Sequence, residues 1–276
     1  MFVEGARDRF FYSRIADAVC DPVGATYQLR LANELPVTTG GKDGLLQFYR
    51  MLEADAGLVG RLGERRWVCA FQMDKDIDDL KDVMVESPHV IYTEHYHVEN
   101  YFFLHGNIVE VVEAVGRQSR ESAEEIATPG WQANVAVALK EWVVLCVTAG
   151  LAAAPCGVNY RSFTRVHAGP PWLCDKARYE QLRAELWQAI GEEAFAPAFG
   201  AAQDLVDELY GSQKQDSVFK GAWYANYLSR ELTAKDPHRR SISVETLLVS
   251  AQQTLEFGGA WAEPLRSQLR RLLELR

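Results

Sequence analysis

Residues 67–79 read WVCAFQMDKDIDD, an apolar run that passes directly into a row of acids. The run over residues 66–73 is almost continuously apolar, which predicts a strand that is buried on both faces, as in parallel sheets. The other patterns in this half predict strands at 1–3, 26–31 and 89–93 and helices over 7–19 and 45–62. Because strands and helices alternate, we predict an α/β fold built on an open, largely parallel Rossmannoid sheet.

The second half of the chain shows helical spacing of apolar residues and almost no strand pattern. Helices are predicted over residues 109–115, 133–153, 176–190, 203–210, 219–232, 244–257 and 264–275. We therefore expect the α/β domain to cover residues 1–118, and a mostly α-helical C-terminal extension to cover residues 119–276.

The composition is that of a globular protein and disfavours some functions. The chain has 276 residues, 48% of them hydrophobic, and a formal net charge of -9. This surplus of acid argues against a generally basic nucleic-acid coat, so nucleic-acid binding would need local basic patches or metal ions. Residues 135–154 are very apolar, but Lys140 and Glu141 interrupt them, which favours a buried helix over a membrane span.

The cysteines and the N-terminal residues bear on the compartment. The five cysteines form no CxxC pair, which predicts free thiols and a reducing cytoplasm. The first residues show no basic leader followed by an apolar run and a cleavage site, so no secretion signal is expected. We expect a cytoplasmic protein with no membrane partner.

Acidic residues follow two of the predicted strands where each strand ends. They are Glu4 and Asp8 near the first strand, and Asp74, Asp76, Asp78 and Asp79 after the third. Ligands in such sheets bind beyond the carboxyl ends of the strands, and carboxylates that meet there repel unless a cation lies between them. One Mg²⁺ could be held by Glu4, Asp74 and Asp76, and a second by Asp8 or Asp78. The alternative is that these acids are ordinary loop residues.

The segment after the fourth strand is also rich in polar side chains. His97, Glu99 and Asn100 could support metal ions, orient water or grip phosphate. A zinc site is disfavoured, because no second His/Cys cluster stands at ligand spacing. The alternative is a helix N-terminus with a polar cap and an aromatic core.

Glycines and basic residues offer further candidates for phosphate contacts. Gly40-Gly41-Lys42 lacks the full phosphate-loop pattern, but Lys42 could still meet a phosphate; a plain turn is the alternative. Lys220-Gly221 could likewise contact a phosphate, or it could simply begin a helix. Basic clusters that could contact a nucleic-acid backbone, or lie on solvated helix faces, are Arg61 with Arg65 and Arg66, residues 238–240, and Arg266 with Arg270 and Arg271.

Several of these segments occur together in an order that resembles a known family. Phe2–Asp8 (FVEGARD), Gly40–Lys42 (GGK), Asp74–Asp76 (DKD) and His97–Tyr101 (HVENY) resemble segments of DUF4435 proteins, which are relatives of TOPRIM nucleases such as the OLD family. The chain is also similar to the TOPRIM effector of PARIS-type anti-phage systems. Phe219–Trp223 (FKGAW) resembles a Lys-Gly segment late in DUF4435 chains.

The resemblance implies a TOPRIM-like nuclease that uses two Mg²⁺ or Mn²⁺ ions. It implies that Glu4 is a metal ligand and the general base or acid, that Asp74 and Asp76 are metal ligands, and that Asp8 serves the second metal. Lys42, His97 and Glu99 would complete the catalytic set, and Asp78 is a further candidate ligand.

The resemblance also implies a role in antiviral defence. Such a toxin-like effector would cleave DNA or RNA, tRNA included, and a partner ABC/SMC-like ATPase would hold it inactive until a phage-encoded trigger releases it, as a homodimer. This chain shows no ATP-binding motif of its own. The alternative is a non-catalytic interaction subunit on a degenerate TOPRIM scaffold.

Overall fold

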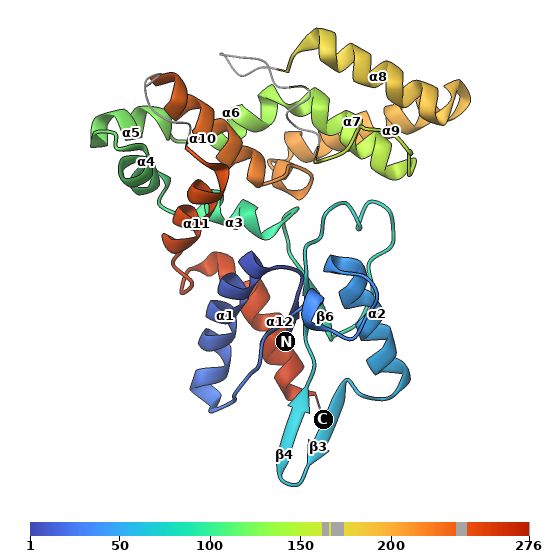
Figure 1. Ribbon diagram of the computed structural model, residues 1–276, viewed down its shortest axis with the longest axis vertical. Coiled ribbons are helices and arrows are strands. Elements are labelled where there is room, and N and C mark those ends of the chain that lie inside the picture. Colours follow the sequence, from blue (N-terminus) through green and yellow to red (C-terminus); the bar gives the residue numbers. More distant parts are fainter. Residues whose placement is uncertain (162–165, 167–173, 236–241, 276) are drawn as a thin grey trace. The chain divides into compact units, whose positions relative to one another are not determined.

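The computed structural model describes residues 1–161, 166, 174–235 and 242–275. Its contacts divide the chain into two compact units (Figure 1). Unit 1 comprises Met1–Lys75, Met84–Glu94 and Glu256–Arg276, and unit 2 comprises Asp76–Val83 and His95–Leu255. The units do not follow the boundary expected at residue 118. Residues His95–Leu255 belong to unit 2, whereas the last helix belongs to unit 1.

A four-stranded parallel sheet forms the centre of unit 1, which confirms the α/β prediction. Its strands lie in the order β2-β1-β5-β6. They are β1 (Phe2–Val3), β2 (Arg30–Leu31), β5 (Phe71–Met73) and β6 (Val90–Tyr92). The order places β1 and β5, which are far apart in sequence, side by side.

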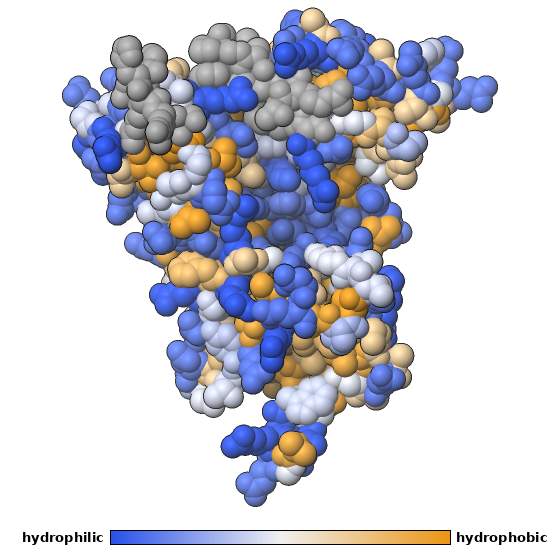
Figure 2. Space-filling model, in the orientation of Figure 1, coloured by the Kyte–Doolittle hydropathy of each residue, from blue (hydrophilic) through white to orange (hydrophobic). Residues whose placement is uncertain are grey.

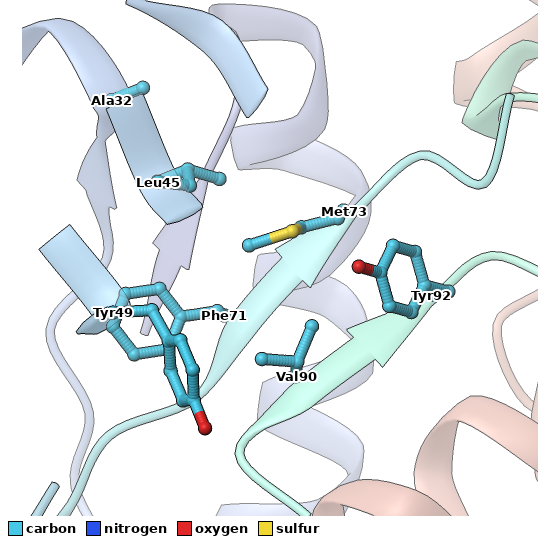
Figure 3. Packing of buried hydrophobic residues seen from close by; sticks show 7 residues of the cluster. All are labelled: Ala32, Leu45, Tyr49, Phe71, Met73, Val90 and Tyr92. Carbon is cyan, nitrogen blue, oxygen red and sulfur yellow. The ribbon is translucent and has the colours of Figure 1, made fainter. Parts of the chain in front are cut away.

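Helix α2 (Gly41–Ala54) packs on the sheet and encloses a hydrophobic core. Phe71 and Met73 lie on one face of β5, because alternate residues of a strand point the same way. Leu45 and Tyr49 of α2 meet them there (Figure 3). This packing fixes β5 and therefore the point at which the acidic segment leaves the sheet.

Two helices from opposite ends of the chain also belong to unit 1. They are α1 (Ala6–Cys20) and α12 (Glu263–Glu274), which pack against each other and contact β1 and β6 respectively. Phe11 stacks on Trp261 with ring centroids 6.0 Å apart. The C-terminal helix is thus part of the core around the sheet.

The structure corrects two expectations between residues 45 and 73. The predicted helix over 45–62 was too long: α2 ends at Ala54, and the chain then forms an antiparallel ribbon of β3 (Val59–Leu62) and β4 (Arg65–Val68). The predicted strand over 66–73 is divided, because β4 pairs in the ribbon and β5 in the sheet. Glycines at 57, 60 and 63 explain the first error, since glycine disfavours a helix interior.

Unit 2 is helical, in agreement with the pattern of the second half. Its helices are α3 (Val98–His105), α4 (Ile108–Gly116), α5 (Arg120–Ile126), α6 (Trp131–Ala138), α7 (Lys140–Leu151), α8 (Lys176–Ile190), α9 (Glu192–Gly211), α10 (Ala222–Lys235) and α11 (Val244–Gln253). Short 3-10 turns lie at Asp21–Val23, Ala32–Glu34, Gln215–Ser217 and Ala260–Ala262.

The single helix predicted over 133–153 is divided at Leu139 into α6 and α7, which are bent by 62°. In α7, every residue from Trp142 to Ala149 is buried. In the described part of the chain, no single helix is long and apolar enough to cross a membrane, although this bent pair passes that test on length and composition.

All five cysteines are free thiols, as expected from their spacing. Cys20 and Cys146 are buried, whereas Cys69, Cys156 and Cys174 are half-buried. Burial raises the pKa of the Cys146 thiol well above its usual value, so this thiol is unreactive at neutral pH.

We predict that Phe71→Ala lowers the free energy of unfolding of unit 1 by about 3–5 kcal/mol, because it removes a fully buried ring between α2 and β5. Urea denaturation measures the change. Val23→Ala is the control, since Val23 is 68% exposed and its loss should cost little. A change under about 1 kcal/mol for Phe71→Ala would contradict this account of the core.

Candidate metal centre and the histidine cluster

A hydrogen bond joins two predicted site residues at the end of the sheet. β1 and β5 run parallel with Val3 opposite Gln72, so the residues that follow leave the sheet side by side. Glu4 Oε1 accepts a hydrogen bond of 2.8 Å from the backbone N–H of Asp74. The Glu4 carboxylate therefore lies at the start of the acidic segment, at the carboxyl edge of the sheet.

Asp8 fixes the loop that carries Glu4. Its Oδ2 accepts a hydrogen bond of 2.7 Å from the backbone N–H of Gly5, which directly precedes α1. The Asp8 side chain is buried in the first turn of α1, where a carboxylate is stabilised by the helix dipole. Asp8 thus lies one turn into the helix, as predicted, and it has a structural role there.

Thr93 fixes the acidic segment from the other side. Its backbone N–H donates to the carbonyl of Met73 at 3.0 Å, and its Oγ1 accepts a hydrogen bond of 2.8 Å from the backbone N–H of Lys75. Thr93 and Lys75 are both buried. The backbone around Asp74 is therefore held by Glu4 from β1 and by Thr93 from β6.

Lys75 is the last residue of the first segment of unit 1, and Asp76 is the first residue of unit 2. The Cα atoms of Asp74 and Asp76 can be at most about 7 Å apart, because only two residue steps separate them. Asp76 has a φ of 53°, a left-handed conformation that costs energy in residues other than glycine and recurs at functional sites. Its backbone N–H donates to the carbonyl of Tyr96 at 2.8 Å, which holds this turn in unit 2.

His97 lies between two carboxylates of unit 2. Its Nε2 is 2.6 Å from Oδ1 of Asp76, and its Nδ1 is 3.2 Å from Oε2 of Glu99. The Glu99 side chain is only 9% exposed and that of His97 is 17% exposed. A neutral imidazole can donate to one of these carboxylates, whereas an imidazolium donates to both. The cluster is thus arranged to hold a proton or a cation.

Asn100 holds His97 at the N-terminus of α3. Its Oδ1 accepts hydrogen bonds of 3.1 Å from the backbone N–H groups of His97 and Gly221. Its Nδ2 donates to Asp216 Oδ1 at 2.9 Å and to the carbonyl of Phe219 at 2.8 Å. The side chain is completely buried, and all the hydrogen-bonding capacity of its amide is used. It therefore fixes the start of α3 in one position.

Gly221 approaches α3 so closely that no side chain would fit. A Cβ at this position would lie 2.3 Å from the backbone nitrogen of Asn100. The glycine of the Lys220-Gly221 pair therefore allows this close packing, and Lys220 lies beside the start of α3 as a result.

Aromatic rings cover one side of the cluster. The ring centroids of Tyr96 and His97 are 4.5 Å apart, and those of Tyr96 and Tyr160 are 4.4 Å apart. Tyr160 stacks in turn on Trp223 at 5.5 Å. Burial, and secondarily the charge of Asp76, raise the pKa of Tyr96 well above its usual value. This side of the cluster is apolar, and Tyr96 stays neutral.

The other predicted site residues lie in turns and at a helix start. Lys42 is half-buried in the first turn of α2. Asp78 and Asp79 lie in the turn of unit 2, where the carbonyl of Asp78 accepts the N–H of Val83 and Asp79 Oδ1 accepts the N–H of Leu80. Their proposed roles in metal or phosphate binding stay predictions.

The three basic clusters have different environments. Arg266 and Arg270 form ion pairs with Glu263 on α12; Arg270 is exposed there, whereas the Arg266 side chain is only 11% exposed and also donates to the carbonyls of Phe257 and Gly259. Residues 238–240 lie outside the described residues. Arg61, Arg65 and Arg66 are all exposed on the ribbon.

The sequence did not single out Thr93 or Asp216 as parts of the site. Thr93 is recognisable only as the residue directly after a strand, and Asp216 only by its place shortly before the Phe219–Trp223 segment. Asp216 meets Asn100 across 116 residues of chain, a pairing that no local pattern indicates.

Comparison with known proteins gave no match. No protein-family model matches this chain, and the search of curated proteins found no match. The function must therefore be argued from the geometry of these groups.

We predict that Asp216 makes stability depend on pH. Burial raises the pKa of its carboxyl group, although hydrogen bonds from Asn100 and Tyr224 oppose this. With a raised pKa in the folded state, its contribution to stability is complete below about pH 4 and is lost as the pH rises through the folded-state pKa. Asp216→Asn keeps an acceptor for both donors and removes the titration. The free energy of unfolding of the variant, relative to the unmodified protein, should therefore increase as the pH rises.

Urea denaturation at several pH values between 4 and 8 measures this difference. Asp207→Asn is the control, because Asp207 is exposed and its pKa is lowered by Lys140, so it should give no gain with rising pH. A difference for Asp216→Asn that does not change with pH would contradict the prediction.

Proposed function

We propose that this chain is a divalent-metal-dependent nuclease that hydrolyses phosphodiester bonds in nucleic acid. The observation that carries the proposal is the hydrogen bond from the Asp74 backbone to the Glu4 carboxylate. It brings together two strand-end acids that are 70 residues apart in sequence, at the edge where open parallel sheets bind their ligands. Hard divalent cations take carboxylate ligands of this kind.

The available donor atoms fit Mg²⁺ or Mn²⁺. We propose that Glu4 and Asp74 of unit 1 supply the carboxylate ligands. Mn²⁺ takes carboxylate ligands as Mg²⁺ does, so it is a suitable probe. A bound divalent cation supplies polarisation of a phosphate group and a more acidic water molecule. Asp8 or Asp78 is the candidate ligand for a second ion.

The residues of the histidine cluster would handle protons. His97 can hold a proton at Nε2 and transfer it, while Asp76 and Glu99 orient the imidazole and stabilise its charged form. Asn100 keeps His97 in position, and Tyr96 with Tyr160 excludes water from one side. Lys42 and Lys220 are candidates for phosphate contacts.

We extend the proposal to a biological role as the effector of an anti-phage defence system. This part is supported by the resemblance to DUF4435 and PARIS-type TOPRIM effectors. A partner ABC/SMC-like ATPase would hold the nuclease inactive until a phage-encoded trigger releases it, because an unrestrained nuclease harms its host. Coexpression with such an ATPase should suppress toxicity.

A second function is favoured by one observation. Protonated His97 would donate hydrogen bonds to both Asp76 and Glu99 and offset one of their two negative charges, without a metal ion. In that case the acids are structural, and the chain is a non-catalytic interaction subunit. Metal binding separates the two functions.

We predict that saturating Mn²⁺ raises the melting temperature by about 5 °C or more, because an ion that binds only the folded state stabilises it. Glu4→Gln should abolish this gain and lower nuclease activity at least about 100-fold. Differential scanning fluorimetry measures the first effect, and cleavage of labelled DNA and RNA with Mg²⁺ or Mn²⁺ measures the second.

Asp55→Asn is the matched control, because Asp55 is an exposed acid of unit 1 that follows α2. It should leave both the stabilisation and the cleavage unchanged. If Mn²⁺ stabilises Glu4→Gln as much as the unmodified protein, the proposed metal centre is wrong. A metal-stabilised chain that cuts no nucleic acid, even with its partner, would favour the interaction subunit.

We predict that His97→Gln lowers kcat by about 100- to 10,000-fold, the usual contribution of a general acid or base. Single-turnover cleavage measures the variant against the unmodified protein. A loss of activity under about 10-fold would contradict the role proposed for His97.

A further inference from the structure

A two-stranded ribbon projects from unit 1 (Figure 1). β3 and β4 pair antiparallel, from Val59 opposite Val68 to Leu62 opposite Arg65. Leu62 is 80% exposed and Trp67 is 45% exposed. Hydrophilic and hydrophobic residues lie next to each other around the tip of the ribbon (Figure 2). Exposed apolar side chains that lie together on one face mark interaction surfaces.

The charges of the ribbon are not explained by folding. Arg61 lies directly opposite Arg66, and Arg65 is adjacent, although like charges at opposed positions destabilise a ribbon. In the part of the chain that the structure describes, none of the three pairs with an acidic side chain. Arg61 donates to the carbonyl of Gly63 at 3.0 Å, and Arg66 donates to the carbonyl of Leu275. Three arginines and Glu64 give the ribbon a net charge of +2, in a chain whose net charge is -9.

Trp67 is held over a glycine. Gly60 lies directly opposite it in the register, and a Cβ on Gly60 would lie only 2.1 Å from Trp67 Cζ2 and 2.3 Å from Cε2. The indole therefore occupies the space above the Gly60 backbone, which holds it on the ribbon. The ring is nevertheless about half exposed, so an aromatic surface is presented to the solvent on the face of the ribbon that also carries Leu62 and Arg65.

We propose that the β3–β4 ribbon is a binding site for single-stranded nucleic acid, in which Trp67 stacks on an unpaired base and Arg65, on the same face of the ribbon, contacts a neighbouring phosphate. Aromatic rings between cations are the combination that single strands require, because they alternate planar bases with negative phosphates. A duplex fits less well, since its bases already stack on each other. The inference rests on the proposed function for its substrate class, and it places substrate binding away from the metal ligands.

The test measures binding of fluorescein-labelled 12-nucleotide oligo(dT) and oligo(U) by the full chain, through fluorescence anisotropy in EDTA. EDTA prevents cleavage and separates ribbon binding from the metal centre. We expect Trp67→Ala to weaken binding about 5- to 150-fold, the usual effect of losing one stacked base. Arg65→Gln should reduce the slope of log K against log salt by about 0.7, since each phosphate contact contributes about 0.7 in a single strand.

Trp187→Ala and Arg178→Gln are the matched controls. Trp187 is 42% exposed on α8, close to the exposure of Trp67, and Arg178 is exposed on the same helix. These variants should bind the oligonucleotides like the unmodified protein. Trp67→Phe should retain most of the binding because it keeps an aromatic ring, and an unchanged melting temperature for each variant excludes misfolding.

The results distinguish this inference from the proposed function. Glu4→Gln should keep oligonucleotide binding and lose metal stabilisation, whereas the ribbon variants should do the reverse. The inference is overturned if the unmodified chain binds neither oligonucleotide, or if the ribbon variants bind as well as the controls. It is also overturned if light scattering shows that the ribbon variants change only the oligomeric state, since the ribbon is then an interface with a second copy. Equal binding of a 12-base-pair duplex, with no effect of Trp67→Ala, would exclude stacking.

Discussion

The parallel pairing of β1 with β5 is the constraint on which the proposed site depends. Each strand has only two or three residues, yet together they fix where two distant segments leave the sheet. The hydrogen bond from the Asp74 backbone to the Glu4 side chain lies directly beyond Val3 and Gln72, the last paired residues of the two strands. A shift of one residue in register would turn Glu4 to the opposite face. The packing of Phe71 and Met73 against α2 prevents such a shift, so a hydrophobic core determines the position of a polar group.

A buried polar network has the corresponding role in unit 2. Asn100 and Asp216 hold the start of α3, and His97 takes its position from that start. A partly satisfied network of this kind would be costly in a dry interior, whereas this one satisfies every donor and acceptor of the Asn100 amide. The left-handed backbone of Asp76 is a further cost. The network thus fixes the position of His97, whereas the conformation of Asp76 costs stability.

The sequence was sufficient to predict the parallel sheet and the position of Glu4 and Asp74 at strand ends, because both follow from the short-range alternation of apolar residues. It was not sufficient to predict the ribbon. The apolar residues over 45–62 have the spacing of a helix, and the glycines after residue 56, which disfavour a helix, were not taken into account. The break at Leu139 has no glycine or proline to mark it. The contacts of Asn100 with Asp216 and Gly221 connect segments more than a hundred residues apart, and only tertiary structure brings them together.

A crystal of the full chain soaked in Mn²⁺ and measured for anomalous scattering tests the central claim most directly. The account predicts an anomalous peak within about 2.5 Å of a carboxylate oxygen of Glu4 or Asp74, at the carboxyl edge of the sheet. The same experiment with Glu4→Gln should show the peak reduced or absent. A saturated crystal in which the Mn²⁺ peaks lie elsewhere, with Glu4 bound only to the Asp74 backbone, would contradict a metal centre at this edge.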